Sequence, residues 1–206
     1  MTNSENKKRK ELRMRVIIKG VLGFLMILVF RVTKKGEKSI PKEGAVILCP
    51  NHIHFFDPAA VVLRLKRKIY PIAKEELVKN PLLRYLGNVF EATTIKRDGT
   101  GIAGVKASLK ILKEKQGAIL IYPEGTRNGL AKGRKPKDGA VTLALKTGAP
   151  IVPIGIQGNF KLFTKVKLNI GEPIYYTKKY VGDKTNEQLT TELMEEIVRL
   201  RDEKGK

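Results

Sequence analysis

The chain has 206 residues, a length that fits one domain, and its 41 Lys and Arg against 20 Asp and Glu give a net charge of +21 at pH 7. A surface this basic attracts polyanions, meaning nucleic acid or an anionic membrane. The single cysteine, Cys49, excludes an internal disulfide and indicates a reducing, intracellular setting. Its apolar neighbours favour a packed core residue over a nucleophile.

Residues 1–40 are predicted to form a membrane-associating helical segment in front of a folded domain at 41–206. The apolar stretch 20–30 follows a basic run and is shorter than the ~20 residues that a spanning helix needs. We therefore expect a monotopic anchor at the cytoplasmic face of a membrane, with its cations at lipid phosphates. The basic run comprises Lys7, Lys8, Arg9, Lys10, Arg13, Arg15 and Lys19.

Two other interpretations of this segment remain open. A signal peptide has similar basic and apolar regions, but here the charged sequence 31–35 follows in place of a small-residue cleavage site. The other interpretation is an amphipathic helix that packs on the domain's own core.

Apolar runs predict strands, and helical spacing of apolar residues predicts helices, along the rest of the chain. Strands are expected at 45–49, 69–73, 91–95, 118–122, 150–156 and 166–170. Helices are expected at 58–65, 102–115 and 138–147, with a broken helical segment at 75–86 that restarts at Pro81. Thr185 to Gln188 makes a capping box, followed by an apolar stripe at Leu189, Leu193, Ile197 and Leu200.

This alternation predicts an α/β fold with a mixed, largely parallel central sheet flanked by helices. In such folds the active site lies at the loops that leave the strands. His52 follows the strand at 45–49, and Glu124 follows the strand at 118–122. Both residues are therefore expected at the functional edge of the sheet.

The octapeptide 51–58 places His52 and Asp57 five positions apart. Histidine exchanges a proton near neutral pH, and a carboxylate on its other ring nitrogen fixes the tautomer. Five residues of ideal helix turn through about 500°, so the two side chains would not share a helix face. Asp before Pro58 is a helix-start signal, which predicts His52 on a loop and Asp57 at the N-cap. The alternative is that Asp57 only caps the helix and His52 is a polar loop residue.

The hexapeptide 122–127 has residue types that suit phosphate binding. Arg127 offers a planar fork of donors, Gly125 lets the backbone approach a ligand, and Thr126 adds a hydroxyl. Glu124 is expected to pair with the arginine or to bind a substrate hydroxyl. The alternative is a strand-ending turn with a surface ion pair.

Two further segments are weaker signals. Arg97 lies just beyond the strand at 91–95, where a solvated turn is the plain alternative. Pro153 lies within the strand at 150–156, which either lines an apolar channel or is a core strand with the proline at an edge or bulge.

Taken in order, these four segments resemble the motifs of one family, the 1-acylglycerol-3-phosphate acyltransferases (lysophosphatidic acid acyltransferases). The resemblance runs from about 44 to 158, in a motif-bearing core of about 44–160, and rests on His52, Asp57 and the segments 96–98, 124–127 and 152–155. Each motif alone is common, and the order and spacing of all four make the match specific. One position departs from the pattern: His54 stands where members often have serine, which adds a second candidate base.

The resemblance implies acyl transfer from acyl-CoA or acyl carrier protein to the sn-2 hydroxyl of lysophosphatidic acid, giving phosphatidic acid in phospholipid biosynthesis. It implies His52 as the general base, Asp57 as the residue that orients it, and no covalent acyl-enzyme. Pro153 is implied on the acyl or thioester side. The residues implied to hold or shape the acceptor phosphate pocket are Arg97, Glu124, Gly125, Thr126 and Arg127. No cofactor or metal is implied, and the partners are the two substrates and an anionic membrane surface.

Other functions stay open at this point. The acceptor is alternatively glycerol 3-phosphate or another lysolipid, or the chain is a basic, non-catalytic protein that binds membranes or nucleic acid. Against nucleic acid, the sequence shows no helix-turn-helix, zinc-finger or RNA-recognition pattern. A metal enzyme would take nearly all its ligands from His52, His54 and Asp57, because the chain has only two histidines.

Overall fold

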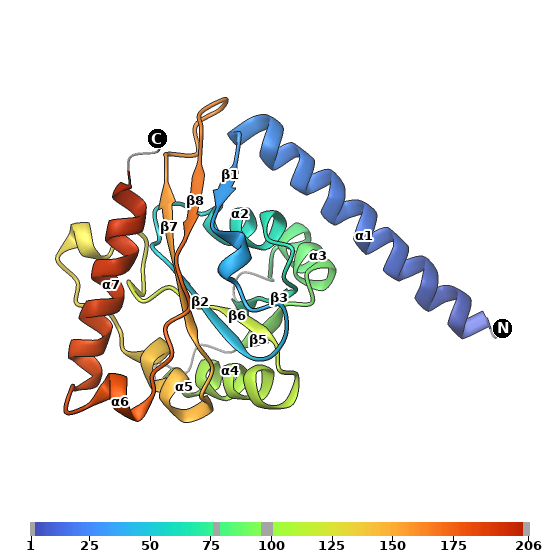
Figure 1. The fold of residues 1–206 in the computed structure, drawn as a ribbon. Helices are drawn as coiled ribbons and strands as arrows, with labels where there is room; N and C mark the ends of the chain where they lie inside the picture. The colour runs from blue at the N-terminus through green and yellow to red at the C-terminus, as the bar shows by residue number, and fades with distance from the viewer. Residues whose placement is uncertain (1–2, 76–78, 96–100, 204–206) are drawn as a thin grey trace.

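The computed structural model describes residues 3–75, 79–95 and 101–203, and a six-stranded sheet forms its centre (Figure 1). In spatial order its strands are β1 (Thr33–Lys35), β8 (Lys167–Ile170), β7 (Ile151–Gln157), β2 (Val46–Pro50), β6 (Ala118–Leu120) and β3 (Ile69–Tyr70). Every neighbouring pair is parallel except β7 and β8. The predicted α/β class with a largely parallel sheet is confirmed.

The sheet separates two apolar cores, and β2 contributes to both. Val46 and Leu48 face one core, and Ile47 and Cys49 face the other. The first core includes residues of helix α2 (Asp57–Arg64). The second core lies under three helices, α4 (Ile102–Glu114), α5 (Gly139–Thr147) and α7 (Asn186–Asp202). All of β2 is buried, as expected for a parallel strand that is covered on both faces.

Helix α7 follows the sequence prediction closely. The Thr185 hydroxyl accepts the Gln188 N–H, and the Gln188 side chain accepts the Thr185 N–H, which completes the capping box. The four predicted apolar residues are buried against the sheet: Leu189, Leu193, Ile197 and Leu200. A short helix, α6 (Lys178–Val181), precedes α7 and was not predicted.

The predicted strand at 69–73 is wrong as a single element. It divides at Pro71 into β3 of the central sheet and β4 (Ile72–Lys74), which pairs in parallel with β5 (Thr93–Ile95) in a separate small sheet. Proline has no N–H for a ladder, so the division falls where the hydrogen bonding must break. The helix predicted to restart at Pro81 is α3 (Pro81–Val89).

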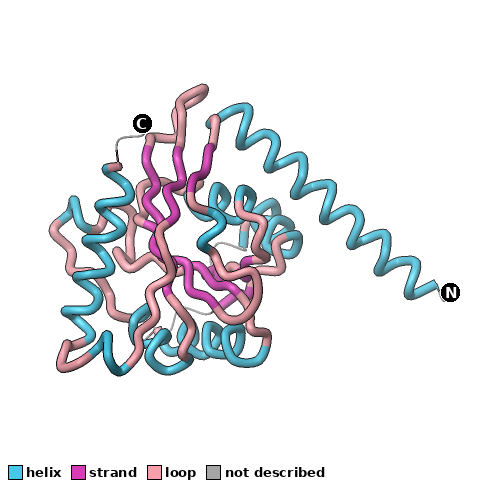
Figure 2. The backbone as a smooth tube through the Cα atoms, in the orientation of Figure 1, coloured by secondary structure: helices cyan, strands magenta, loops and turns pink. Residues whose placement is uncertain are grey.

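The first part of the chain forms one long helix, α1 (Asn3–Phe30), which extends as an arm from the body (Figures 1 and 2). Its C-terminal part packs on α2, with Gly23 close to the carbonyl oxygen of Leu63 and Phe30 against the first core. Packing on the domain's own core therefore accounts for one part of α1. Exposed apolar side chains along α1 are Leu12, Met14, Val16, Ile17, Val21, Phe24, Leu25, Ile27 and Leu28.

Two features bear on the predicted N-terminal segment. None of the helices that the structure describes has an apolar stretch long enough to cross a bilayer. The central sheet already begins at Thr33, followed by a 3₁₀ turn at Glu37–Ser39, so the folded body starts before the predicted boundary at residue 40. Strand β1 was not predicted because its sequence, Thr-Lys-Lys, has no apolar pattern.

Candidate active site

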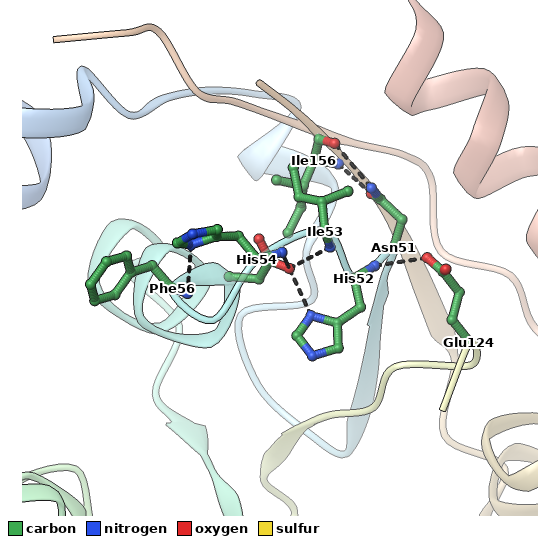
Figure 3. A network of polar contacts seen from close by, with 8 residues as sticks. Asn51, His52, Ile53, His54, Phe56, Glu124 and Ile156 are labelled. Atoms are coloured by element: carbon green, nitrogen blue, oxygen red, sulfur yellow. Dashed lines mark hydrogen bonds and ion pairs between the residues drawn. The ribbon is translucent and has the colours of Figure 1, made fainter. Parts of the chain in front are cut away.

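The site begins where β2 ends, at the buried residue Asn51. Its amide Nδ2 donates to the carbonyl oxygen of Ile156 on β7 at 3.0 Å, and its Oδ1 accepts the N–H of the same residue at 2.6 Å (Figure 3). These two bonds continue the β2–β7 pairing beyond the last residue of the strand. They fix the direction in which the chain leaves the sheet, so His52 enters its loop at the carboxyl edge, as predicted.

One carboxylate oxygen of Asp57 contacts three residues of the loop that precedes α2. Asp57 Oδ2 lies 2.7 Å from His52 Nδ1 and accepts the backbone N–H groups of Ile53 and His54 at 2.7 and 2.8 Å. Asp57 is fully buried, and three donors to its Oδ2 offset the cost of desolvating its charge. The predicted proximity of the His52 and Asp57 side chains is confirmed.

The predicted N-cap at Asp57 is wrong by one residue. Phe56 is the N-cap, and Asp57 is the first residue of α2, followed by Pro58. The carboxylate turns back to the preceding loop and not to its own helix, because the N–H groups of Ile53 and His54 are presented to it there. The alternative in which Asp57 only caps a helix is therefore also wrong.

The contact with Asp57 determines which nitrogen of His52 is available for chemistry. An ionised carboxylate only accepts hydrogen bonds, so we assign the ring proton to Nδ1 and a lone pair to Nε2. Figure 3 shows the second ring nitrogen pointing away from the polar network. The His52 side chain is 19% exposed, so part of it is accessible to solvent. A histidine held in this way has the geometry of a general base with an orienting carboxylate.

The loop after β6 holds the backbone of His52 on both sides. Glu124 Oε1 accepts the His52 N–H at 2.8 Å, and the Asn128 N–H donates to the His52 carbonyl oxygen at 2.6 Å. The second oxygen of Glu124 accepts the N–H of Leu130 at 3.1 Å, and Glu124 is buried. Both carboxylate oxygens bind backbone N–H groups, and the described residues show no ion pair between Glu124 and Arg127. A hydrogen bond from a substrate hydroxyl to Glu124 stays a prediction. Glu124 shapes the loop and joins it to His52.

Tyr122 is a site residue to which the sequence analysis assigned no role. Its ring lies 4.2 Å from the His52 ring, centroid to centroid, with 31° between the planes. Its hydroxyl and Asp57 Oδ1 are buried and have no hydrogen-bond partner within the part of the chain that the structure describes. Burial, reinforced by the negative charge of Asp57, raises the pKa of Tyr122 well above its usual value. The Tyr122 side chain is therefore uncharged, and its ring packs against one face of the His52 ring.

His54, the second candidate base, has a different environment. Its ring stacks on Phe160 at 5.1 Å with 15° between the planes, and its Nδ1 accepts the Phe56 N–H at 3.3 Å. The backbone N–H of His54 binds Asp57, but the imidazole does not. His52 is therefore the histidine that the carboxylate orients, which favours it over His54 as the base.

The residues predicted to bind phosphate lie on the loop that holds His52. Gly125 has φ +67°, and a Cβ there would lie 3.1 Å from Cε and 3.2 Å from Cδ of Lys137. The Lys137 stem thus crosses Gly125 and brings a cation, missed in the sequence, to the loop that carries the half-buried Thr126 and the exposed Arg127. Arg97 lies outside the described residues, so its place at this site stays a prediction.

Pro153 lies inside the sheet, on β7. It pairs in register with Cys49 on β2, and its Cγ would be 2.9 Å from a Cβ at Gly171, next to Leu200 of α7. Pro153 is buried in the α7 layer, whereas Val152 and Ile154 face the α2 side. Its role on the acyl side stays a prediction, and this geometry favours a packing role.

The ranges that the structure describes offer no set of metal ligands for the alternative of a metal enzyme. They contain no group of three or more His, Cys, Asp or Glu side chains placed to hold an ion.

Comparison with known proteins gives consistent matches. Residues 31–157 match the family model described as Acyltransferase. A 1-acyl-sn-glycerol-3-phosphate acyltransferase of Bacillus subtilis is 31% identical over 145 residues, which cover 68% of this chain and 71% of that protein. One from Borreliella burgdorferi is 30% identical over 155 residues, which cover 73% of this chain. This chain spans 61% of the Borreliella protein and 64% of a relative of the same name from Limnanthes alba.

The fold also matches a solved structure. The structure of the 1-acyl-sn-glycerophosphate acyltransferase PlsC from Thermotoga maritima superposes with a TM-score of 0.66 at 25% identity. The match covers 100% of this chain and 86% of that one.

Proposed function

Because the chain belongs to the acyltransferase family, we propose that it transfers a fatty acyl group from an acyl thioester to the sn-2 hydroxyl of 1-acyl-sn-glycerol 3-phosphate. The product is phosphatidic acid, an intermediate of phospholipid biosynthesis. The observation that carries this proposal is the 2.7 Å contact of His52 Nδ1 with the buried Asp57, which leaves Nε2 as a base. The names of the relatives from three bacteria support the choice of acceptor.

The proposed reaction has two proton transfers at one nitrogen. His52 Nε2 takes the proton of the sn-2 hydroxyl while the hydroxyl oxygen attacks the thioester carbonyl carbon. The tetrahedral intermediate then collapses, the carbon–sulfur bond breaks, and the imidazolium returns the proton to the leaving thiolate. Asp57 stabilises the imidazolium through Nδ1. A positioned base typically contributes about 10²–10⁴-fold, and positioning of the substrates and stabilisation of the oxyanion supply the remainder.

Direct transfer agrees with the surroundings of the one cysteine. Cys49 is fully buried in the core under α4, α5 and α7, and burial raises the pKa of its thiol. A protonated, enclosed thiol is a poor nucleophile, because the thiolate is the reactive form. The acyl group therefore passes from donor to acceptor without an acyl-enzyme on Cys49.

The acceptor phosphate is proposed to bind at the loop 125–127. Arg127 is exposed there, the Lys137 stem lies across Gly125, and Glu124 ties the loop to the catalytic histidine. A phosphate bound to these cations would hold the glycerol backbone within reach of His52. Arg97, which the resemblance assigns to the same phosphate, is retained as a proposed ligand.

The basic, apolar α1 is proposed as the membrane contact that gives access to a lipid acceptor, at the cytoplasmic face. The basic run at 7–19 and the exposed apolar side chains from Leu12 to Leu28 overlap along this helix. Cations at lipid phosphates with apolar residues in the acyl region are typical of interfacial anchors.

Acceptor dependence tests this function. The purified chain is incubated with a long-chain acyl thioester, and free thiol release is followed with lysophosphatidate, glycerol 3-phosphate or lysophosphatidylcholine. We expect rapid release only with lysophosphatidate. Release with glycerol 3-phosphate or with the choline lysolipid would assign another acceptor, and no release with any of the three would contradict acyl transfer. An Arg127→Gln variant should raise the KM for lysophosphatidate and leave the KM for the thioester near its original value.

A further inference from the structure

The loop that joins β7 to β8, residues 158–166 and here called the hairpin tip, exposes two large apolar side chains. Leu162 and Phe163 are each 69% exposed, more than any other large apolar residue that the structure describes. Phe163 also has φ +60°, a left-handed backbone conformation that is rare for a bulky residue. Exposure in water and backbone conformation both disfavour phenylalanine at this position, which indicates a surface that takes up the side chain.

The hairpin tip is joined to the end of α1. The Phe163 N–H donates to the carbonyl oxygen of Val29 at 2.7 Å, and the Val166 N–H donates to that of Phe30 at 3.2 Å. Figure 1 shows the hairpin tip and the C-terminal end of α1 beside each other at one end of the molecule. The last two turns of α1, which lead to this end, also carry exposed apolar residues: Phe24, Leu25, Ile27 and Leu28.

Aromatic contacts also join the hairpin tip to the active-site loop. Phe160 packs against Phe30 at 5.5 Å and stacks on His54 at 5.1 Å. Phe30 in turn lies 5.3 Å from Phe56, and the His54 N–H donates to Asp57. Packed side chains thus connect the hairpin tip to the loop between β2 and α2, which contains His52.

We propose that the hairpin tip inserts Leu162 and Phe163 into an anionic lipid bilayer, as a second membrane contact beside α1. Lys161 and Lys165 flank the two apolar residues and are exposed, which places cations at the level of the lipid phosphates. The net charge of +21 favours an anionic bilayer over a second copy of the chain, which would bring like charge to the same surface. This proposal rests on the proposed function in one respect only, namely that the acceptor is a lipid.

A single fluorescent reporter tests the insertion. The sequence has no tryptophan, so Phe163→Trp places one indole at the hairpin tip of the full chain. With vesicles of phosphatidylcholine and phosphatidylglycerol, we expect a blue shift and strong quenching by bromine-labelled acyl chains. The matched control is Tyr175→Trp, at an aromatic residue that is 54% exposed between β8 and α6. Equal quenching of the two reporters would overturn the proposal, as would a blue shift that needs high protein concentration and no vesicles.

Binding of a double variant provides the second test. Leu162→Ser/Phe163→Ser should lower the vesicle partition coefficient at least about tenfold, because two apolar side chains no longer leave water. The control pair Leu145→Ser/Tyr175→Ser, at exposed residues elsewhere, should bind as the original chain does. Unchanged partitioning of the double variant would overturn the proposal. Thiol release with a short-chain lysophosphatidate below its micelle concentration should be unchanged in the double variant, so a failure of the proposed function is read separately from a failure of membrane contact.

Discussion

The buried carboxylate of Glu124 accepts the backbone N–H of His52 at 2.8 Å, across 72 residues of sequence. The two residues follow β2 and β6, which are parallel neighbours, so their loops leave the same edge of the sheet. The contact turns two separate sequence motifs into one site. It also gives Glu124 a positioning role that a carboxylate facing solvent would not have.

Replacement of Glu124 tests this role. Glu124→Gln puts an amide donor against one of two backbone N–H groups, so we expect a loss of about 1–3 kcal/mol in the free energy of unfolding. Displacement of His52 should lower kcat by roughly 10–100-fold. Chemical denaturation and thiol release measure the two effects. Glu187→Gln, at an exposed ion pair with Lys135, is the control and should cost no more than about 1 kcal/mol. Equal effects of the two substitutions would argue against the positioning role.

The strands with continuous apolar sequence were predictable. Val46–Cys49 and Ile151–Ile156 are buried in a largely parallel sheet that is covered on both faces, and such strands leave a continuous apolar run in the sequence. Strand β1 leaves none, because its residues are polar and it lies at the sheet edge. The division at Pro71 was missed because the choice between two sheets depends on partners, Ala118 and Thr93, that are far away in sequence.

The pairing of His52 with Asp57 was predictable from local spacing, but the contacts that other residues make to hold the site were not. Glu124 looked like a ligand-binding carboxylate, and its backbone partners at His52 and Leu130 emerge only from the fold. Tyr122 and Lys137 had weak signals: an aromatic residue at the end of an apolar run, and a lysine among many others. Contacts between distant segments, which set these roles, leave no periodic pattern in one sequence.

Substitution of Tyr122 separates its ring from its hydroxyl. Tyr122→Phe removes a buried hydroxyl that has no protein partner in the described chain, so stability should be unchanged or higher and turnover should stay within a few-fold. Tyr122→Ala removes the ring packed on His52 and should cost about 3–5 kcal/mol of stability along with most activity. Thermal unfolding and thiol release are the measurements. A severe loss of turnover in Tyr122→Phe would show that the hydroxyl itself takes part.

The thiol of Cys49 predicts how stability depends on pH. Burial raises the pKa of this thiol in the folded chain, whereas the unfolded chain loses the proton above about pH 8.5. The unfolded state is then favoured increasingly as pH rises, until the folded pKa is reached, by about 1.4 kcal/mol per pH unit. Cys49→Ala should remove this part of the decline and retain turnover. Urea titrations between about pH 8 and pH 10 measure the slope, and equal slopes for the two proteins would contradict the prediction.

The basic run of α1 should contribute to membrane binding through charge. Arg9→Gln/Lys10→Gln/Arg13→Gln removes three exposed cations, each worth about 1 kcal/mol near an anionic surface, so partitioning to anionic vesicles should fall about 100-fold. Binding to neutral vesicles should change little. The control Lys106→Gln/Lys110→Gln/Lys113→Gln removes three exposed lysines from α4. An equal loss in both variants would indicate that overall charge, and not α1, directs binding.

The rate of thiol release by His52→Ala, compared with His54→Ala, tests the central claim most directly. With lysophosphatidate and a long-chain acyl thioester, His52→Ala should lose at least about 10²-fold in kcat while its unfolding temperature stays close to that of the original chain. His54→Ala, which loses the stack on Phe160 and the hydrogen bond from the Phe56 N–H, should retain a substantial part of its activity. Full activity in His52→Ala, or inactivity confined to His54→Ala, would contradict the assignment of His52 as the base.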